Sequence, residues 1–408
     1  MNNALHTADI LLPRPGVDLT KWAVVACDQF TAQPEYWERA EALVGEAPSA
    51  LRLILPEAWL NESERRVPAI HRAMADYLDT GVLKTAVEDG FVLVERATAA
   101  GVRPGLMAAL DLEQYDFTPG SDSLIRATEG TVLERVPPRA RIRAGAPVEL
   151  PHVMMLIDDP ADTVIGPLAA RREALRPLYD FELMLGGGHL RGWAVEGENT
   201  RGVFEAVDAL NAKANGLLYA VGDGNHSLAA ARQCWLDIRD TLPEDARENH
   251  PARFALAELV NLHCPALVFE PIHRLLTGVD PAALMAKYRE SLAADGADEG
   301  AGDDLTAFDG AGHTWGFRSA EHPLWRLQRF IDGYLARHPQ ASVDYIHGED
   351  ALRELVGSRP DALGLMPRAF DKGELFDAVR RHGVLPRKTF SMGEATEKRY
   401  YLEARRIL

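Results

Sequence analysis

The spacing of apolar residues predicts both strands and helices in the N-terminal third of the chain. Residues 63–80 carry apolar side chains at Val67, Ile70, Met74 and Leu78, the three- and four-residue spacing of an amphipathic helix. Two apolar stretches, 90–96 and 105–111, are separated by a polar segment with Gly and Pro, which is typical of a β-hairpin. Helix and strand periods therefore follow one another in this part of the chain.

A second pattern lies in the middle of the chain. Residues 217–221 form a short apolar run that predicts a buried strand, and an alanine-rich helix is expected over about 227–240. Between them stands Gly-Asp-Gly-Asn-His-Ser, residues 222–227, which carries an acid, an imidazole and a hydroxyl as well as turn formers. This strand–turn–helix segment is the strongest candidate for a functional site.

The order of the elements indicates an α+β fold, because strands and helices mix without strict alternation. An apolar run at 51–55 predicts a further strand, and the Gly- and Asp-rich stretch 295–312 predicts an exposed loop. A chain of 408 residues is long for one core. We expect three regions: an N-terminal α+β region at 1–120, a central region with the strand–turn–helix segment at 121–290, and a C-terminal α+β region at 291–408.

Composition narrows the class of protein. Lys and Arg total 44 against 61 Asp and Glu, a net charge of −17, which disfavours a nucleic-acid-binding surface. No apolar stretch is long enough to cross a membrane and the N-terminus lacks the features of a signal peptide, so we expect a cytoplasmic protein with a small-molecule ligand or nucleotide as partner. The three cysteines, Cys27, Cys234 and Cys264, adjoin apolar residues and are interpreted as core residues.

The residues of the turn have types that suit a ligand site. Gly222 and Gly224 permit a sharp bend, and the N–H groups at the start of the following helix favour a phosphate or carboxylate. Ser227 can cap the helix or contact an anion, while Asp223 and His226 have the chemistry of an acid, a base or a metal ligand. The same residues are also typical of an ordinary turn and N-cap, so spacing alone leaves both interpretations open.

The segment resembles the D-G-H-H-R signature of the DUF1015 family, and other motifs of that family occur in order along the chain. These are Val24–Asp28 with Leu53–Pro56, Arg126-Ala-Thr-Glu129-Gly-Thr131, Ile157–Pro160, Pro271-Ile-His273-Arg274-Leu275, Asp344-Tyr345, and Leu385–Phe390 with Lys388. The resemblance covers nearly the whole chain. Two positions depart from the signature: Asn225 stands where the family has His, and Ser227 where it has Arg.

The resemblance implies a nucleotide site. The family's turn is similar to one in the ParB/sulfiredoxin-like fold, some members of which are free-serine kinases that bind nucleotides at this loop. It implies a phosphate pocket at residues 223–227, with ADP or ATP and Mg²⁺ as candidate ligands. No residue is assigned as a metal ligand, and whether a metal is bound stays open. Asn225 and Ser227 are neutral and cannot supply the positive charge that phosphate binding needs. That charge would have to come from helix N–H groups, from a metal or from an Arg elsewhere in the chain.

Several residues outside the turn are candidates to complete the site. Arg126 and Glu129 have the types needed for a phosphate-binding cation and a base. Thr131 is a further ligand candidate in the same motif. The other candidate ligand-binding residues are Asp28, His273, Arg274 and Lys388.

We therefore expect a nucleotide-dependent small-molecule kinase or phosphotransferase in which Asp223, His226 and Glu129 are catalytic. A non-catalytic small-molecule-binding protein would keep the pocket without a base. A metal-assisted hydrolase would use the same three residues.

Overall fold

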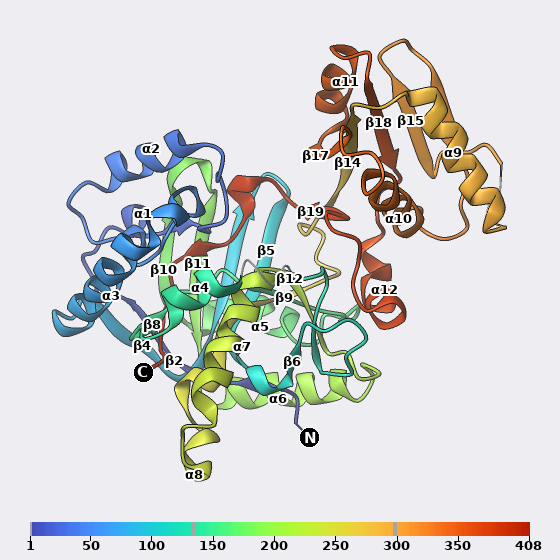
Figure 1. The fold of residues 1–408 in the computed structure, drawn as a ribbon. Coiled ribbons are helices and arrows are strands. Elements are labelled where there is room, and N and C mark those ends of the chain that lie inside the picture. The colour runs from blue at the N-terminus through green and yellow to red at the C-terminus, as the bar shows by residue number, and fades with distance from the viewer. Residues whose placement is uncertain (1, 132–135, 297–299) are drawn as a thin grey trace. The chain divides into compact units, whose positions relative to one another are not determined.

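The computed structural model describes residues 2–131, 136–296 and 300–408, which form two compact units (Figure 1). The first unit comprises Met1–Val268, Phe376–Val384 and Gly393–Leu408, and the second comprises Phe269–Leu375 and Leu385–Met392. The division after Val268 falls inside the central region expected from the sequence. The expected C-terminal region, 291–408, is shared between the two units.

The first unit is built on a mixed sheet that has 11 strands among the described residues. Its order is β10–β11–β4–β5–β13–β9–β12–β7–β6, with β1 beside β5 and β2 beside β4. The fold is α+β, as the sequence predicts. The strands are β1 (Leu5–His6), β2 (Ala8–Pro13), β4 (Leu83–Thr98), β5 (Gly101–Asp111), β6 (Tyr115–Asp116), β7 (Ile125–Ala127), β9 (Met154–Ile157), β10 (Arg176–Glu182), β11 (His189–Val195), β12 (Tyr219–Asp223) and β13 (Phe254–Asn261).

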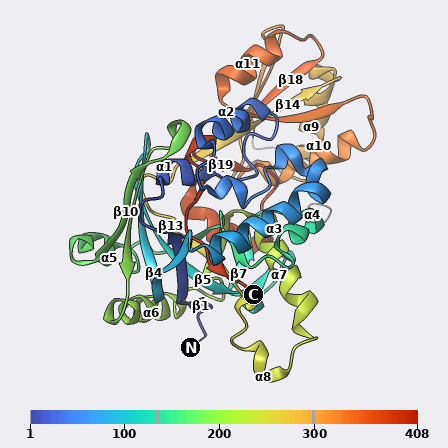
Figure 2. The same ribbon diagram turned by 90° about the vertical axis from the view of Figure 1, so that its left-hand side faces the viewer.

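Both faces of this sheet are covered, which explains the continuous apolar runs in its central strands. In β4, Val92 and Val94 enter one hydrophobic cluster, whereas Phe91 and Leu93 enter another. The first cluster includes residues of α2 (Pro34–Val44) and α3 (Ser63–Asp79), and the second includes residues of α6 (Glu198–Asn211) and α7 (Asn225–Arg239). Helix α4 (Val136–Arg143) packs against α7 (Figure 2).

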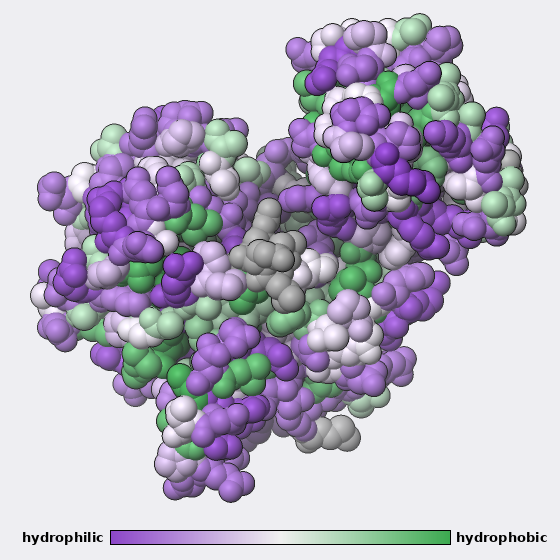
Figure 3. Space-filling view, viewed as in Figure 1, coloured by the Kyte–Doolittle hydropathy of each residue, from purple (hydrophilic) through white to green (hydrophobic). Residues whose placement is uncertain are grey.

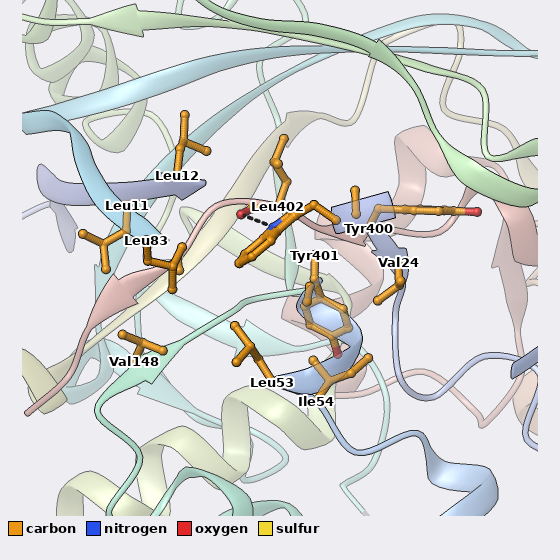
Figure 4. Close-up of a cluster of buried hydrophobic side chains, with 14 of the residues drawn as sticks. Leu11, Leu12, Val24, Leu53, Ile54, Leu83, Val148, Tyr400, Tyr401 and Leu402 are labelled. Atoms are coloured by element: carbon orange, nitrogen blue, oxygen red, sulfur yellow. Dashed lines mark hydrogen bonds between the residues drawn. The ribbon is translucent and has the colours of Figure 1, made fainter. Parts of the chain in front are cut away.

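Apolar residues of the C-terminal segment 393–408, from Tyr400 to Ile407, are buried in the first cluster (Figure 4). Tyr400, Tyr401 and Leu402 lie among side chains from the N-terminal part of the chain, including Leu11 and Val24. The segment pairs with β3 (Val24–Val25) through β20 (Tyr400–Tyr401) and with β8 (Val148–Glu149) through β21 (Arg405–Arg406). Residues 400–405 are therefore an internal element of the first unit.

The second unit has a six-stranded sheet among the described residues, with β19 beside β14 and the order β16–β15–β18–β14–β17. Leu363 and Leu365 of β18 pack with helices α9 and α10, and Ala362 packs with α11 on the opposite face. The elements are β14 (Phe269–Thr277), α9 (Pro281–Ala294), β15 (Leu305–Asp309), β16 (Thr314–Phe317), α10 (Leu324–Leu335), β17 (Ser342–His347), α11 (Glu349–Gly357), β18 (Ala362–Pro367) and β19 (Phe390–Met392). Helix α12 (Leu375–His382) belongs, after Leu375, to the first unit.

The structure confirms the hairpin, the helix 63–80 and the strand–turn–helix segment, which correspond to β4–β5, α3 and β12–α7. The strand expected at 51–55 is wrong. The side chain of Ser49 accepts a hydrogen bond from the Leu51 N–H and begins a 3₁₀ turn, Ala50–Arg52, so these apolar residues are buried without forming a strand.

The loop expected over 295–312 is also wrong in part. Residues 297–299 of that stretch lie outside the described residues. Strand β15 lies within the rest, and its Leu305 and Ala307 are fully buried against the second unit's helices. Apolar residues at alternate positions in an otherwise Asp- and Gly-rich stretch carry that strand.

The surfaces of the two units have the polar character expected from the composition. Hydrophilic side chains cover most of the face of each unit seen in Figure 3, and hydrophobic side chains form small separate patches. Over the described parts of the chain, every helix is too short or too polar to cross a lipid bilayer.

Candidate functional site

The polar turn lies at one edge of the large sheet, where two parallel strands end together. Strand β12 pairs in parallel with β7, Val221 opposite Ala127. Thr128 and Glu129 therefore leave β7 at the same edge at which Asp223 and Gly224 leave β12. The Thr128 hydroxyl donates a hydrogen bond of 2.6 Å to the carbonyl of Val221 and fastens the two strand ends together.

The third strand at this edge runs the other way. Strand β9 is antiparallel to β12, so His152 and Val153, which precede β9, lie where β12 ends. Gly224 has a φ of +82°, a left-handed conformation that favours glycine. A Cβ atom at this position would stand 3.1 Å from Val153, which is a very tight contact. Conformation and space together require glycine at the bend.

Helix α7 starts directly after Gly224, which is its N-cap residue. Its first helical hydrogen bond runs from the Leu228 N–H to the Gly224 carbonyl at 3.0 Å. Ser227 is therefore a residue of the first turn rather than the N-cap, and its hydroxyl contacts Nε2 of His152 at 3.1 Å. The first turn brings a partial positive charge to the edge, which favours an anion there.

A lysine from the C-terminal segment completes the charge at the turn. Nζ of Lys398 lies 3.6 Å from Oδ2 of Asp223, and both side chains are mostly buried. The other carboxylate oxygen of Asp223 accepts a hydrogen bond from the N–H of Gly224 at 2.9 Å. Asp223 therefore fixes the bend and holds a cation beside the start of α7.

His152 connects this turn to the buried C-terminal segment. Its Nδ1 lies 2.6 Å from the hydroxyl of Tyr401, and that oxygen also accepts a hydrogen bond from the N–H of Cys27 at 3.2 Å. Burial and the nearby Cys27 and Asp28 raise the pKa of Tyr401 well above its usual value, so the phenol keeps its hydrogen. We infer that, when His152 is neutral, the phenol donates to Nδ1 and the imidazole carries its hydrogen on Nε2.

This tautomer decides what Ser227 can do. A hydrogen on Nε2 of His152 is donated to the Ser227 oxygen, which leaves the serine hydroxyl hydrogen for a ligand. The histidine cannot at the same time take a proton from the serine. The pair therefore has the arrangement of a ligand-binding pair and lacks the tautomer that a serine nucleophile needs.

Asp28 lies next to the same histidine. Its Oδ2 is 3.9 Å from Nε2 of His152, too far for a hydrogen bond, and its Oδ1 accepts a bond from the amide of Gln29 at 3.3 Å. Burial alone would raise the pKa of Asp28, but the charge of His152 in its protonated form, the Gln29 amide and Arg139 outweigh it and hold the pKa below its usual value. The carboxylate is thus a charged hydrogen-bond acceptor at neutral pH.

A pocket of about 130 Å³ is lined by Ser227 and His152. Most of its wall is aliphatic and comes from the segment after Ala50, from α3 and α4, and from α7. The two guanidinium groups in the wall are paired, Arg139 with Glu57 and Arg143 with Glu149. Burial raises the pKa of the Cys27 thiol, also in the wall, to about 12, so this cysteine is not a thiolate nucleophile at neutral pH.

The structure brings together part of the residue set expected from the sequence. Thr131 follows β7 by a few residues, and its buried hydroxyl has no hydrogen-bond partner among the described residues. In the first turn of α7, the side-chain oxygen of Asn225 is buried and lacks such a partner as well. His226 is half-buried in the same turn, and Glu129 is half-buried at the end of β7.

Arg126 is not brought to this edge. Its guanidinium donates to the carbonyls of Ser123 and Gly216, at 2.9 and 3.0 Å, and both residues precede the strands whose far ends form the turn. The guanidinium of Arg126 extends toward the start of its strand because the carbonyl groups that accept its hydrogen bonds lie in the loops before β7 and β12.

His273, Arg274 and Lys388 belong to the second unit. Arg274 is fully buried, donates to the carbonyls of Ile272 and Arg387, and lies 5.2 Å above the ring of Tyr345. Burial lowers the pKa of the His273 imidazole. Lys388 has a left-handed backbone conformation, with a φ of +55°. Arg274 therefore has a structural role within its own unit.

Sequence reasoning missed His152, Lys398 and Tyr401. His152 carried a weak signal, because it stands directly before the apolar run 153–157 that forms β9. Lys398 and Tyr401 carried none, since only the return of the C-terminal segment into the core places them here. No group of three His, Cys, Asp or Glu side chains placed to hold a metal occurs in the described ranges.

Comparison with known proteins identifies a family. The family described as "Protein of unknown function (DUF1015)" matches residues 11–352. No significant match was found among curated proteins.

Three solved structures resemble the chain at low identity. A free serine kinase in complex with AMP has a TM-score of 0.40 and 10% identity, covering 74% of this chain and 92% of that one. A conserved hypothetical protein from Pyrococcus furiosus has a TM-score of 0.35 and 10% identity, covering 72% and 90%. C-terminally truncated SbnI from Staphylococcus aureus has a TM-score of 0.37 and 9% identity, covering 70% and 83%. The ParB/sulfiredoxin-like fold stays a prediction.

Proposed function

We propose a function for this chain, which belongs to the DUF1015 family of proteins of unknown function, from the chemistry of its site. The protein binds a nucleotide at the edge formed by β7, β12 and α7, and transfers the terminal phosphoryl group to a hydroxyl of a small molecule. The observation that supports this most is the left-handed Gly224, which brings the start of α7 beside Asp223 and Lys398.

The roles follow from the groups at this edge. The phosphates lie against Gly222, Gly224, Asn225 and Ser227, where backbone N–H groups and a serine hydroxyl are donors. In the family signature an arginine at the position of Ser227 supplies positive charge, and in this chain Lys398 supplies it instead. This substitution explains how a neutral Ser227 is compatible with a phosphate site.

The proposed transfer conserves atoms and charge. The oxygen of the acceptor hydroxyl attacks the terminal phosphorus and forms a new O–P bond, while the bond from phosphorus to the bridging oxygen breaks and the shortened nucleotide leaves. The hydroxyl proton passes to a carboxylate, for which Asp223 and Glu129 are the candidates, with His226 as a second acid–base group. Mg²⁺ bound with the nucleotide would offset its negative charge.

A binding protein without catalysis is the second candidate. Asp223 already holds Lys398 and the N–H of Gly224, which is the arrangement of a structural carboxylate as much as that of a base. The distinction requires a turnover measurement with Asp223→Asn and Glu129→Gln. A kinase loses activity in at least one of them and keeps nucleotide binding, whereas a binding protein shows no turnover in any variant.

The test of nucleotide binding is a thermal-shift titration with ADP and ATP, with and without Mg²⁺. Lys398→Met should weaken binding about 10- to 100-fold, because a hydrogen bond to a charged group contributes about 1.5–3 kcal/mol. Lys213→Met, on an exposed lysine of the same unit, is the matched control. Absence of any nucleotide-dependent shift in the wild-type protein would refute the proposal.

A further inference from the structure

Three side chains form a hydrogen-bonded chain from the C-terminal segment to the start of α7. The Tyr401 hydroxyl lies 2.6 Å from Nδ1 of His152, and Nε2 of the same imidazole lies 3.1 Å from the Ser227 hydroxyl. Tyr401 is 2% exposed and His152 is 6% exposed. Because water hardly reaches either ring, each contact in the chain decides where the next hydrogen points.

Backbone contacts set the position of the phenol. Tyr401 lies in β20, which pairs with β3 at Val24, and its ring meets the imidazole of His152 edge-on, with ring centroids 5.5 Å apart at an angle of 88°. The N–H of Cys27 donates to the phenol oxygen at 3.2 Å. A backbone N–H cannot accept a hydrogen bond, so this contact uses one lone pair of the oxygen and leaves the phenol hydrogen for Nδ1.

A carboxylate acts on the other side of the imidazole. Oδ2 of Asp28 lies 3.9 Å from Nε2 of His152, where its negative charge favours a hydrogen on that nitrogen. The phenol at Nδ1 and the carboxylate near Nε2 therefore favour the same tautomer from two different parts of the chain. In the protonated imidazole both nitrogens carry a hydrogen, so Nε2 presents an N–H to Ser227 in either state.

The orientation of the Ser227 hydroxyl follows from this N–H. The serine oxygen accepts from Nε2, which leaves the hydroxyl hydrogen for a phosphate oxygen at the start of α7. An imidazole with its hydrogen on Nδ1 would instead accept the serine hydrogen at Nε2, and the lone pairs of the serine oxygen would face the phosphate. A negatively charged ligand is attracted in the first arrangement and repelled in the second.

We propose that Tyr401 is a positioning residue of the nucleotide site, which through His152 holds Ser227 as a hydrogen-bond donor to a phosphate group. The inference rests on the proposed function, because it assigns this donor to a phosphate beside α7. The Tyr401 hydroxyl contacts Cys27 and His152 and acts on the nucleotide through the imidazole. The C-terminal segment thus contributes to the site twice, by the charge of Lys398 and by the phenol of Tyr401.

The test is a double-mutant cycle on the affinity for ADP with Mg²⁺. Ser227→Ala should weaken binding about tenfold, as expected for loss of a hydrogen bond to a charged group. Tyr401→Phe should weaken it about three- to tenfold in the wild-type background, but less than about twofold in the Ser227→Ala background. Tyr400→Phe is the matched control, because it removes the neighbouring buried phenol hydroxyl, which donates to the carbonyl of Met184, and should leave the affinity unchanged.

Two outcomes of the cycle would overturn the inference. Equal weakening by Tyr401→Phe in both backgrounds would mean that the phenol does not act through Ser227. Equal effects of Tyr400→Phe and Tyr401→Phe would mean that any buried hydroxyl of this strand affects the site in the same way.

The wild-type protein provides a second measurement that does not depend on the folding of a tyrosine variant. NMR chemical shifts of the two ring nitrogens of His152, assigned by comparison with His152→Gln, are followed from about pH 6 to about pH 9, across the usual histidine pKa of about 6.5. We expect the neutral ring to carry its hydrogen on Nε2. A hydrogen on Nδ1 would overturn the inference whether or not nucleotide binds. The expected tautomer without any nucleotide binding would refute the proposed function and leave the alignment of Ser227 by Tyr401 standing.

Discussion

Removal of Arg399 is the sharpest test of how the C-terminal segment holds the site. Arg399 is buried between two carboxylates, 3.1 Å from Glu258 of β13 and in contact with Glu403. All three side chains are at most 3% exposed. The guanidinium therefore ties the segment that carries Lys398 and Tyr401 to the centre of the large sheet.

The expected cost follows from the charge left behind. Arg399→Met keeps much of the side-chain volume but leaves two buried carboxylates, of which Glu258 retains Arg103, at 3.9 Å, as its one ion-pair partner among the described residues. Breaking a buried ion pair on one side costs about 3–5 kcal/mol. Adding Glu403→Gln to Arg399→Met removes one of the stranded charges and should restore at least a third of that loss, or about 1 kcal/mol or more.

Hydrogen–deuterium exchange of peptides from 393–408 is the direct assay, because the chain has two units and a single unfolding transition is not expected. Arg399→Met should speed exchange in this segment about 100-fold or more, since about 1.4 kcal/mol corresponds to a factor of ten. Nucleotide binding should weaken in parallel through Lys398. The control is Arg406→Met, on an exposed arginine of the same segment.

Two results would refute this reasoning. Exchange of the segment in Arg399→Met within threefold of wild type would mean that apolar packing alone holds it. A double variant less protected than the single one would mean that the loss does not arise from uncompensated charge.

Three further predictions concern the bend and two titrating groups. Gly224→Ala should lower the melting temperature and abolish nucleotide-induced stabilisation, because both its φ of +82° and Val153 at 3.1 Å oppose a side chain; normal nucleotide binding would contradict this. Asp28 has a folded-state pKa below its usual value, so its contribution to stability is present above about pH 4 and is lost as pH falls further. Urea unfolding should therefore show Asp28→Asn as less destabilising at pH 3 than at pH 7. Burial lowers the pKa of His322 to about 4, and its Nδ1 accepts a hydrogen bond from the N–H of Leu324. The free energy of unfolding of the second unit should therefore fall by about 3 kcal/mol between pH 6.5 and pH 4. His322→Gln should remove this pH dependence.

The sequence by itself determined the local elements and the chemistry of the turn. The alternation of apolar residues in the hairpin and their helical spacing over 63–80 are local properties, and the structure has both elements. Residues 222–227 could be identified as a candidate site because several polar, reactive side chains rarely occur together between a buried strand and a helix. The left-handed Gly224 could be expected on the same ground, since a sharp bend between these elements needs glycine.

Only the tertiary structure decided which residues meet that turn. Strand order brought Thr128 beside Val221, and the antiparallel course of β9 brought His152, although it lies 75 residues before Ser227 in the sequence. Arg126 shows the reverse case, because the carbonyls near it draw its guanidinium to the opposite end of the strand. Lys398 and Tyr401 are at the site because burial of a tail far along the chain stabilises the core. Such non-local burial has no period or spacing that a single sequence could reveal.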